Sequence, residues 1–323
     1  MTRLFPVLLA LLAGAAALSA QPRFPHDVSN LRPDPAVRFG SLPNGLRYAV
    51  MANPEPRQRA SLRLHVDVGS LHETETQRGL AHFLEHMAFN GSRQYPPGTL
   101  VEFFQRMGMN FGGDTNASTG FDRTLYMLEL PETKEATLTE GFKVLQEYAD
   151  GLLLNDAEIE RERGVIQSEK RTRDSVDYRS FVAEFEFVLG DSLFPRRMPI
   201  GTDEVIRSAP RSEFIDFYNT WYRPERMTLI AVGDFDVDLV ERLIVAAFTP
   251  IAPRAEARPE PDLGQVTAFE GVRIKYYAEP EAAATTVGIQ VMTPYSAEPD
   301  TAANRLKYLP RDLAVAMVNR RLA

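Results

Sequence analysis

The sequence predicts an α+β fold, in which helices pack on one face of a mainly antiparallel sheet. Residues 61–68 alternate between apolar and polar side chains, which is the pattern of a half-buried strand. Residues 124–130 (TLYMLEL) predict a second strand that ends at Pro131, because proline cannot donate a hydrogen bond to a sheet. Amphipathic helices are predicted between and after these strands, so both element types contribute to the core.

The elements before residue 250 follow from hydrophobic periodicity and from polar residues at helix starts. In chain order they are a helix over 79–90, a helix over 137–153, a helix from Asn155 through Glu169, a helix from Ser212, a strand over 227–232 and a helix from Asp236. Asn155, Ser212 and Asp236 are expected to cap their helices, because short polar side chains accept hydrogen bonds from free backbone N–H groups.

The clearest domain boundary lies where Pro, Arg, Glu and Ala accumulate and the periodicity is lost. We therefore expect one domain over residues 21–250, a linker over 251–264 and the beginning of a second domain over 265–323. That last segment is short for an independent domain, since domains usually have about 100–150 residues.

Three elements are predicted after the linker. Residues 272–277 and 285–292 have the pattern of strands, and residues 311–322 that of a helix. Pro310 suits the first position of that helix, where a missing N–H group costs nothing.

The first residues of the chain have the pattern of a secretory signal. Arg3 precedes an apolar run from Leu4 to Leu18, and Ala20 ends a plausible cleavage site. The run is shorter than the ~20 residues that a membrane-spanning helix needs. Residues 1–20 therefore predict a signal peptide and a periplasmic or secreted protein with no stable membrane span after cleavage. The alternative is an uncleaved membrane anchor.

Composition narrows the classes of function. A formal net charge of −8, without a dense basic run, argues against a nucleic-acid partner. The 323 residues include no cysteine, which excludes disulfides, iron–sulfur clusters and cysteine-bound zinc. A transition metal would have to use histidine and carboxylate ligands, and the chain has only five histidines.

Two of these histidines lie in the sequence HFLEH, four residues apart with a glutamate between them. On a helix that turns about 100° per residue, His82, Glu85 and His86 project from one sector, while the neighbouring apolar residues face the other. Histidines at this spacing can chelate one Zn²⁺ ion, and Glu85 would lie where a general base is needed. Ordinary surface or core histidines are the alternative. His26, His65 and His72 have no comparable context.

A catalytic zinc also needs a third protein ligand and an open position. The helix after Asn155 offers several carboxylates, of which Glu162 and Glu169 lie two turns apart on one face. An acidic helix is as often a solvated surface. Periodicity alone does not choose between Glu162 and Glu169.

The same residues match a family signature. Residues 68–91 contain VGS, Glu73, GL and HFLEHM in an order that resembles the signature of the M16 metallopeptidases, a family that includes pitrilysin, insulinase and the β subunit of mitochondrial processing peptidase. The segments 116–119 (NAST), 162–169 (ERGVIQSE) and 222–234 are similar to further family segments. The resemblance covers most of residues 40–300.

The resemblance implies roles for the acidic residues. The last glutamate of ERGVIQSE corresponds to the third zinc ligand, which selects Glu169 and implies one Zn²⁺ per chain. Glu162 would support a ligand histidine from behind. Glu85 would be the general base that acts on a zinc-bound water.

The resemblance also implies how substrate and partner bind. Asn116, Ala117 and Ser118 would lie on an edge strand that pairs with an extended peptide or unfolded polypeptide. The family's fold contains a homologous second half, which supplies an arginine and a tyrosine to the oxyanion site. Residues 265–323 would be an incomplete copy of the first domain, so the chain would be the N-terminal part of a longer one.

The expected function is therefore a zinc metalloendopeptidase. Within the same fold, the chain could instead be a catalytic subunit that needs a homologous partner chain. The alternative from another class is a non-catalytic M16-like binding or assembly subunit. Such subunits usually lose the HxxEH residues, whereas His82, Glu85 and His86 are all present here.

Overall fold

A computed structural model describes residues 24–110, 112–293 and 296–322. The residues of the expected signal peptide, 1–20, lie outside this described part. The chain divides into two compact units, of which the larger is formed by Arg32–Glu298 and the smaller by the two ends of the chain. Within the described residues, no helix combines the length and the apolar character needed to cross a membrane.

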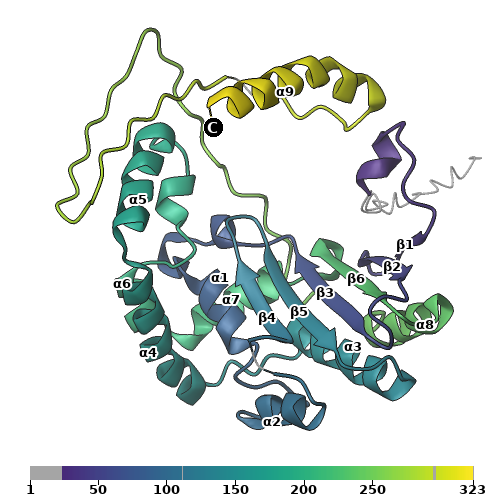
Figure 1. The fold of residues 1–323 in the computed structure, drawn as a ribbon. Helices are drawn as coiled ribbons and strands as arrows, with labels where there is room; N and C mark the ends of the chain where they lie inside the picture. The colour runs from purple at the N-terminus through teal and green to yellow at the C-terminus, as the bar shows by residue number, and fades with distance from the viewer. Residues whose placement is uncertain (1–23, 111, 294–295, 323) are drawn as a thin grey trace, which may run out of the picture. The chain divides into compact units, whose positions relative to one another are not determined.

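The larger unit is built on one six-stranded sheet with the order β1-β2-β6-β3-β5-β4 (Figure 1). Its strands are β1 (Val37–Ser41), β2 (Arg47–Ala52), β3 (Ala60–Val66), β4 (Thr115–Thr119), β5 (Thr124–Leu130) and β6 (Met227–Gly233). Every neighbouring pair is antiparallel except β2 and β6. The α+β fold with a mainly antiparallel sheet is thus confirmed.

Helices cover one face of this sheet, as the alternation in β3 predicts. The helices of the described residues are α1 (Leu80–Met87), α2 (Thr99–Arg106), α3 (Glu135–Asp150), α4 (Asp156–Arg173), α5 (Val176–Leu189), α6 (Asp203–Ser208), α7 (Arg211–Trp221), α8 (Val237–Phe248) and α9 (Ala302–Leu322). Leu62 and Leu64 of β3 are fully buried, and Gly141 allows α3 to approach Leu62 closely. On the opposite face of the sheet, Ile230 of β6 is exposed.

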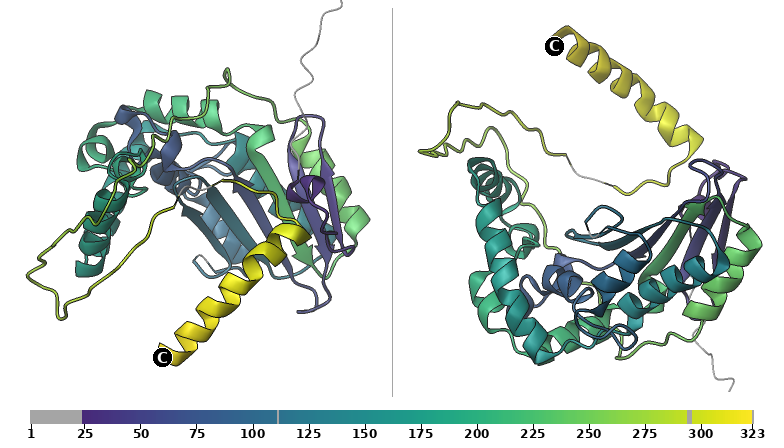
Figure 2. Two further views of the ribbon diagram at one scale, coloured as in Figure 1. Left: turned by 90° about the horizontal axis from the view of Figure 1, so that it is seen from above. Right: turned by 60° about the horizontal axis from the view of Figure 1, so that its bottom comes forward.

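The helices nearest to strand β4 bring distant parts of the chain together. Figures 1 and 2 show α4 and α5 as an outer wall beyond β4, with α1 between this wall and the sheet. Helix α1 contacts both β4 and α4. This packing places the HFLEH helix beside the helix that carries Glu162 and Glu169.

Of the three predicted helix caps, Asp236 is confirmed, Asn155 is confirmed in position only and Ser212 is wrong. Asp236 does cap α8, and its carboxylate accepts a hydrogen bond from the N–H of Leu239. Asn155 stands at the start of α4, but its side chain makes no capping bond, and its backbone oxygen receives the N–H groups instead. Helix α7 begins at Arg211, directly after Pro210, so Ser212 lies inside the first turn. Proline is favourable at a helix start because it has no N–H to satisfy.

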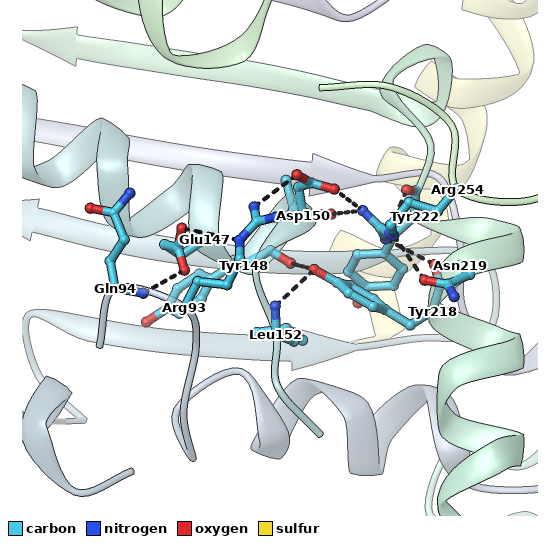
Figure 3. Close-up of polar contacts among 11 residues, drawn as sticks. Arg93, Gln94, Glu147, Tyr148, Asp150, Leu152, Tyr218, Asn219, Tyr222 and Arg254 are labelled. Carbon is cyan, nitrogen blue, oxygen red and sulfur yellow. Dashed lines mark hydrogen bonds and ion pairs between the residues drawn. The ribbon is translucent and has the colours of Figure 1, made fainter. Parts of the chain in front are cut away.

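The linker is irregular, as expected, but it is fastened to the domain (Figure 3). The Arg254 guanidinium lies 4.1 Å from the ring centre of Tyr218 and donates to the side chains of Asp150 and Asn219. It also donates to the backbone oxygen of Tyr222. Arg258 continues the attachment through an ion pair with Asp216. The segment 251–264 is therefore bound to α3 and α7 rather than loose.

After the linker, both predicted strands are wrong, whereas the predicted helix is confirmed but begins earlier. Residues 272–277 and 285–292 form no strand, and Val272 and Ile289 are 85% and 92% exposed. A strand needs a neighbour for its hydrogen bonds, and none lies beside them among the described residues. The last helix begins at Ala302 and contains Pro310 in its interior, rather than beginning there. The second copy of the domain thus remains a prediction.

A backbone contact between two glycines locates the start of α1. Gly79 and Gly201 have φ values of +102° and +70°, and a methyl group on Gly201 would lie 2.4 Å from Cα of Gly79. We expect Gly201→Ala to lower the free energy of unfolding by about 2–4 kcal/mol, since it combines left-handed strain with overlap. Urea denaturation measures this loss.

Gly108→Ala is the matched control for this substitution. Gly108 has φ of +76° but has no atom within 4 Å of an added methyl group. It should lose only the conformational part, about 1 kcal/mol. Equal losses in the two variants would show that the contact between Gly79 and Gly201 contributes nothing.

Candidate metal centre

Helix α1 presents its polar residues in one direction because its other side is anchored in the core. Leu80, Phe83, Leu84 and Met87 are all buried. The free N–H groups at the helix start are held by Glu73, whose buried carboxylate accepts from Gly79 and Ala81 at 2.9 and 2.8 Å. This cap and the apolar anchor together fix the direction in which the two histidines project.

Three side chains converge beside this helix. The nearest donor atoms of His82, His86 and Glu169 all lie within 4.8 Å of one another. Oε2 of Glu169 is 3.5 Å from Nε2 of His82 and 3.3 Å from Nε2 of His86. Two imidazole nitrogens and one carboxylate oxygen are a ligand set that suits Zn²⁺ and leaves one tetrahedral position open.

The pKa values of the two histidines are shifted in opposite directions. Burial and the neighbouring charge of His86 lower the pKa of His82 to about 4, so this imidazole is neutral and able to donate a lone pair. Burial also acts to lower the pKa of His86, but the hydrogen bond to Glu162 and the nearby carboxylates outweigh it, and this pKa is raised. The neutral His82 is ready to bind a metal ion, whereas a raised pKa means that a metal ion would have to displace a proton from Nε2 of His86.

Glu162 contacts the ring nitrogen of His86 that faces away from the cluster, and it does not belong to the cluster itself. Its Oε1 lies 2.9 Å from Nδ1 of His86, which leaves Nε2 directed at Glu169. The side-chain amide of Asn90 donates to the other carboxylate oxygen of Glu162 at 2.9 Å. Although burial acts to raise the pKa of Glu162, the His86 contact outweighs it and the pKa is lowered. A carboxylate in this position orients a ligand histidine.

Asn90 and Arg173 belong to the site but were not found by sequence reasoning. Asn90 is four residues after His86, in the turn that follows α1, and Arg173 is four residues after Glu169, one helical turn further along α4. Arg173 forms an ion pair with Oε1 of Glu169. Oε2 of the same carboxylate faces the histidines. This i, i+4 spacing is the only signal that the sequence offers for either residue.

Glu85 lies beside the cluster and is 7% exposed. Its Oε2 accepts a hydrogen bond of 2.5 Å from the hydroxyl of Thr119 on β4. Burial raises the pKa of Glu85 above its ordinary value, although the Thr119 contact opposes the rise. A buried carboxylate whose pKa is raised binds a proton more readily than an exposed one, which suits it to proton transfer.

Strand β4 carries the three residues expected to bind substrate. It is the edge strand of the sheet, paired only with β5 among the described strands. The side chains of Asn116 and Ser118 are exposed and that of Ala117 is half-buried. The strand therefore offers a free edge next to α1, and none of the three residues joins the cluster of His82, His86 and Glu169.

Two family models match the chain. The family model of insulinase (peptidase family M16) matches residues 48–184, and the model described as the peptidase M16 inactive domain matches residues 208–309. The second match crosses the boundary that we placed at residue 250.

Individual relatives point to the same family. The probable zinc protease PqqL of Haemophilus influenzae is 37% identical over 75% of this chain and 26% of its own length. The zinc protease PQQL-like protein of Arabidopsis thaliana is 36% identical over 78% of this chain and 26% of its own. The chain thus spans about a quarter of the length of these curated relatives.

A solved structure matches the fold as well. The first half of the periplasmic protease PqqL from Escherichia coli matches with a TM-score of 0.70 and 32% identity, over 74% of this chain and 51% of that one. The two family models, the relatives and this structural match agree. The chain therefore belongs to the M16 (insulinase) family of peptidases.

Proposed function

We propose that this chain carries the zinc site of an M16 endopeptidase that hydrolyses peptides or unfolded protein segments. The observation that carries the proposal is the convergence of Nε2 of His82 and Nε2 of His86 on Oε2 of Glu169. These three residues would hold one Zn²⁺ ion per chain, with Glu162 orienting His86. Relatives named as zinc proteases support the same metal.

The chemistry would be divided between the metal and Glu85. A Zn²⁺ ion bound here would lower the pKa of a water molecule and would polarise a peptide carbonyl. Glu85 would take a proton as general base and return it to the leaving amine as general acid. Its burial next to the ligand histidines supports this role, because burial raises the pKa of a carboxylate and makes it a stronger proton acceptor.

Substrate would bind in extended form along the free edge of β4. Asn116, Ala117 and Ser118 would pair through their backbones, which gives affinity without requiring one side-chain sequence. Unfolded segments suit this mode, because a folded protein seldom has a free extended strand to offer.

The remaining donors to the oxyanion would come from a homologous second half or partner subunit. A second half is supported by the relatives, because this chain spans only about a quarter of their length. A partner subunit is supported by the 31% identity to mitochondrial-processing peptidase subunit beta of Bos taurus. The apolar run from Leu4 to Leu18 and the periplasmic location named for the Escherichia coli protease support export.

Metal binding is the first test of this function. The purified chain should contain one zinc per chain by elemental analysis, should lose it to a chelator and should recover it on addition of zinc. A preparation that binds no stoichiometric zinc would contradict the proposal. A protein that binds zinc but cleaves no quenched peptide, with its second half present, would be a non-catalytic assembly subunit.

A further inference from the structure

We propose that Thr119 is a positioning residue that ties the base Glu85 to the edge strand β4. Substrate pairing along β4 and the orientation of the base would thereby depend on the same strand. The inference rests on the proposed function, in which Glu85 is the base and β4 receives the substrate.

The hydrogen bond between these residues is short and specific to one oxygen. The Thr119 hydroxyl donates to Oε2 of Glu85 at 2.5 Å. No other hydrogen bond to the Glu85 carboxylate is present among the described residues. Oε1 is therefore left to accept a proton, while Oε2 is held. A carboxylate bound through one oxygen keeps a defined direction for the other.

Thr119 itself is held in place from two sides. Its backbone pairs with Thr124 of β5, and the turn between the strands closes through the N–H of Gly120 and the oxygen of Arg123. The backbone oxygens of Gly120 and Phe121 accept hydrogen bonds from Ser70 and Leu71. These contacts fasten the end of β4 to the segment that leads into α1. Thr119 is thus a rigid donor rather than part of a mobile loop tip.

Thr119 links the substrate-binding edge of β4 to the base Glu85. Asn116 and Ser118 of the same strand are exposed at the edge where substrate would pair, while the Thr119 side chain points back to the base. A shift of β4 would move the hydroxyl that orients Glu85. Displacement of a reacting group by about 1 Å can cost 100-fold in rate.

Thr119→Val and Thr119→Ser separate this role from a purely structural one. Valine keeps the shape of threonine and removes the hydroxyl, whereas serine keeps the hydroxyl. We expect Thr119→Val to lower kcat by about 10–100-fold, the effect of losing a hydrogen bond to a charged group, with KM and zinc affinity changed less than about threefold. Thr119→Ser should remain within about threefold of the parent protein. Thr228→Val, a half-buried position on β6, is the control for the substitution itself.

Crystal structures of the zinc-loaded variants provide a readout that does not depend on turnover. We expect the Glu85 side chain to change rotamer in Thr119→Val and to keep its position in Thr119→Ser and Thr228→Val. An unchanged kcat together with an unchanged Glu85 in Thr119→Val would overturn the inference. So would a rise in KM with kcat preserved, because it would assign Thr119 to substrate binding alone.

Failure of the proposed function has a different signature. A parent protein that binds zinc and cleaves nothing, with its second half present, would remove the peptidase proposal. In that case the rotamer of Glu85 in the three structures still decides whether Thr119 orients it.

Discussion

Glu85→Gln is expected to keep one zinc per chain and to lower kcat by about 10²–10⁴-fold, the usual contribution of a general base. Zinc should remain because the Glu85 carboxylate is not among the atoms that converge in the cluster. The amide is close in size to the carboxylate, so the buried pocket beside Thr119 should stay filled. What is lost is the ability to accept a proton. Steady-state cleavage of a quenched peptide with the second half present, and elemental analysis of the same preparation, measure the two effects.

Glu160→Gln is the matched control for that experiment. Glu160 lies on α4, is largely exposed and pairs with Arg163 rather than with the cluster. The same chemical change there should leave both zinc content and kcat unaltered. If Glu85→Gln cleaved as fast as the parent protein, Glu85 would not be the base. If it lost zinc, the carboxylate would be a ligand or would hold the helix in place.

The elements that carry the site could be predicted because local pattern determines them. The HFLEH segment has one apolar and one polar sector, and as α1 it buries the first and presents the second. The alternation of residues 61–68 likewise became β3, although the strand begins and ends slightly earlier. In both segments, the local pattern of apolar and polar residues decides which side chains are buried.

Roles that depend on how two helices cross could not be read from periodicity. Glu162 and Glu169 share a face of α4, but they lie about 10 Å apart along its axis. Only the packing of α1 against α4 places one at Nδ1 of His86 and the other at Nε2. The family resemblance of the ERGVIQSE segment implies the same division of roles. The assignment of ligand and support remains a prediction that needs a test.

The role of Thr119 could not be predicted either, because it also depends on tertiary packing. Thr119 reaches Glu85 across 34 positions of sequence, and nothing in its neighbours indicates the contact. The strands expected over 272–277 and 285–292 failed for the converse reason. Their alternation is genuine, but a strand exists only when another supplies its hydrogen bonds.

Glu169→Gln and Glu162→Gln form a matched pair that decides which carboxylate is the ligand. The two residues lie on the same helix and undergo the same change. Glu162→Gln should keep one zinc per chain and weaken its affinity by about 10–100-fold, because His86 loses an orienting partner. Glu169→Gln should weaken it further and lose stoichiometric zinc, since a neutral amide replaces the one anionic ligand. Competition with a chelator of known affinity measures both constants.

The two outcomes are separable because each carboxylate has a second partner that identifies it. Asn90 holds Glu162, so Asn90→Ala should reproduce a weaker form of the Glu162→Gln effect. Arg173 pairs with the outer oxygen of Glu169, so Arg173→Gln should leave zinc stoichiometry intact while Oε2 still faces the histidines. Complete loss of zinc in Glu162→Gln, with full retention in Glu169→Gln, would exchange the two roles. Such a result would require α4 to slide by two turns relative to α1 when the metal binds. The buried Ile166 and the hydrogen bonds of Arg163 to the backbone oxygens of Ile206 and Ala209, which hold α4 in place, argue against such a slide.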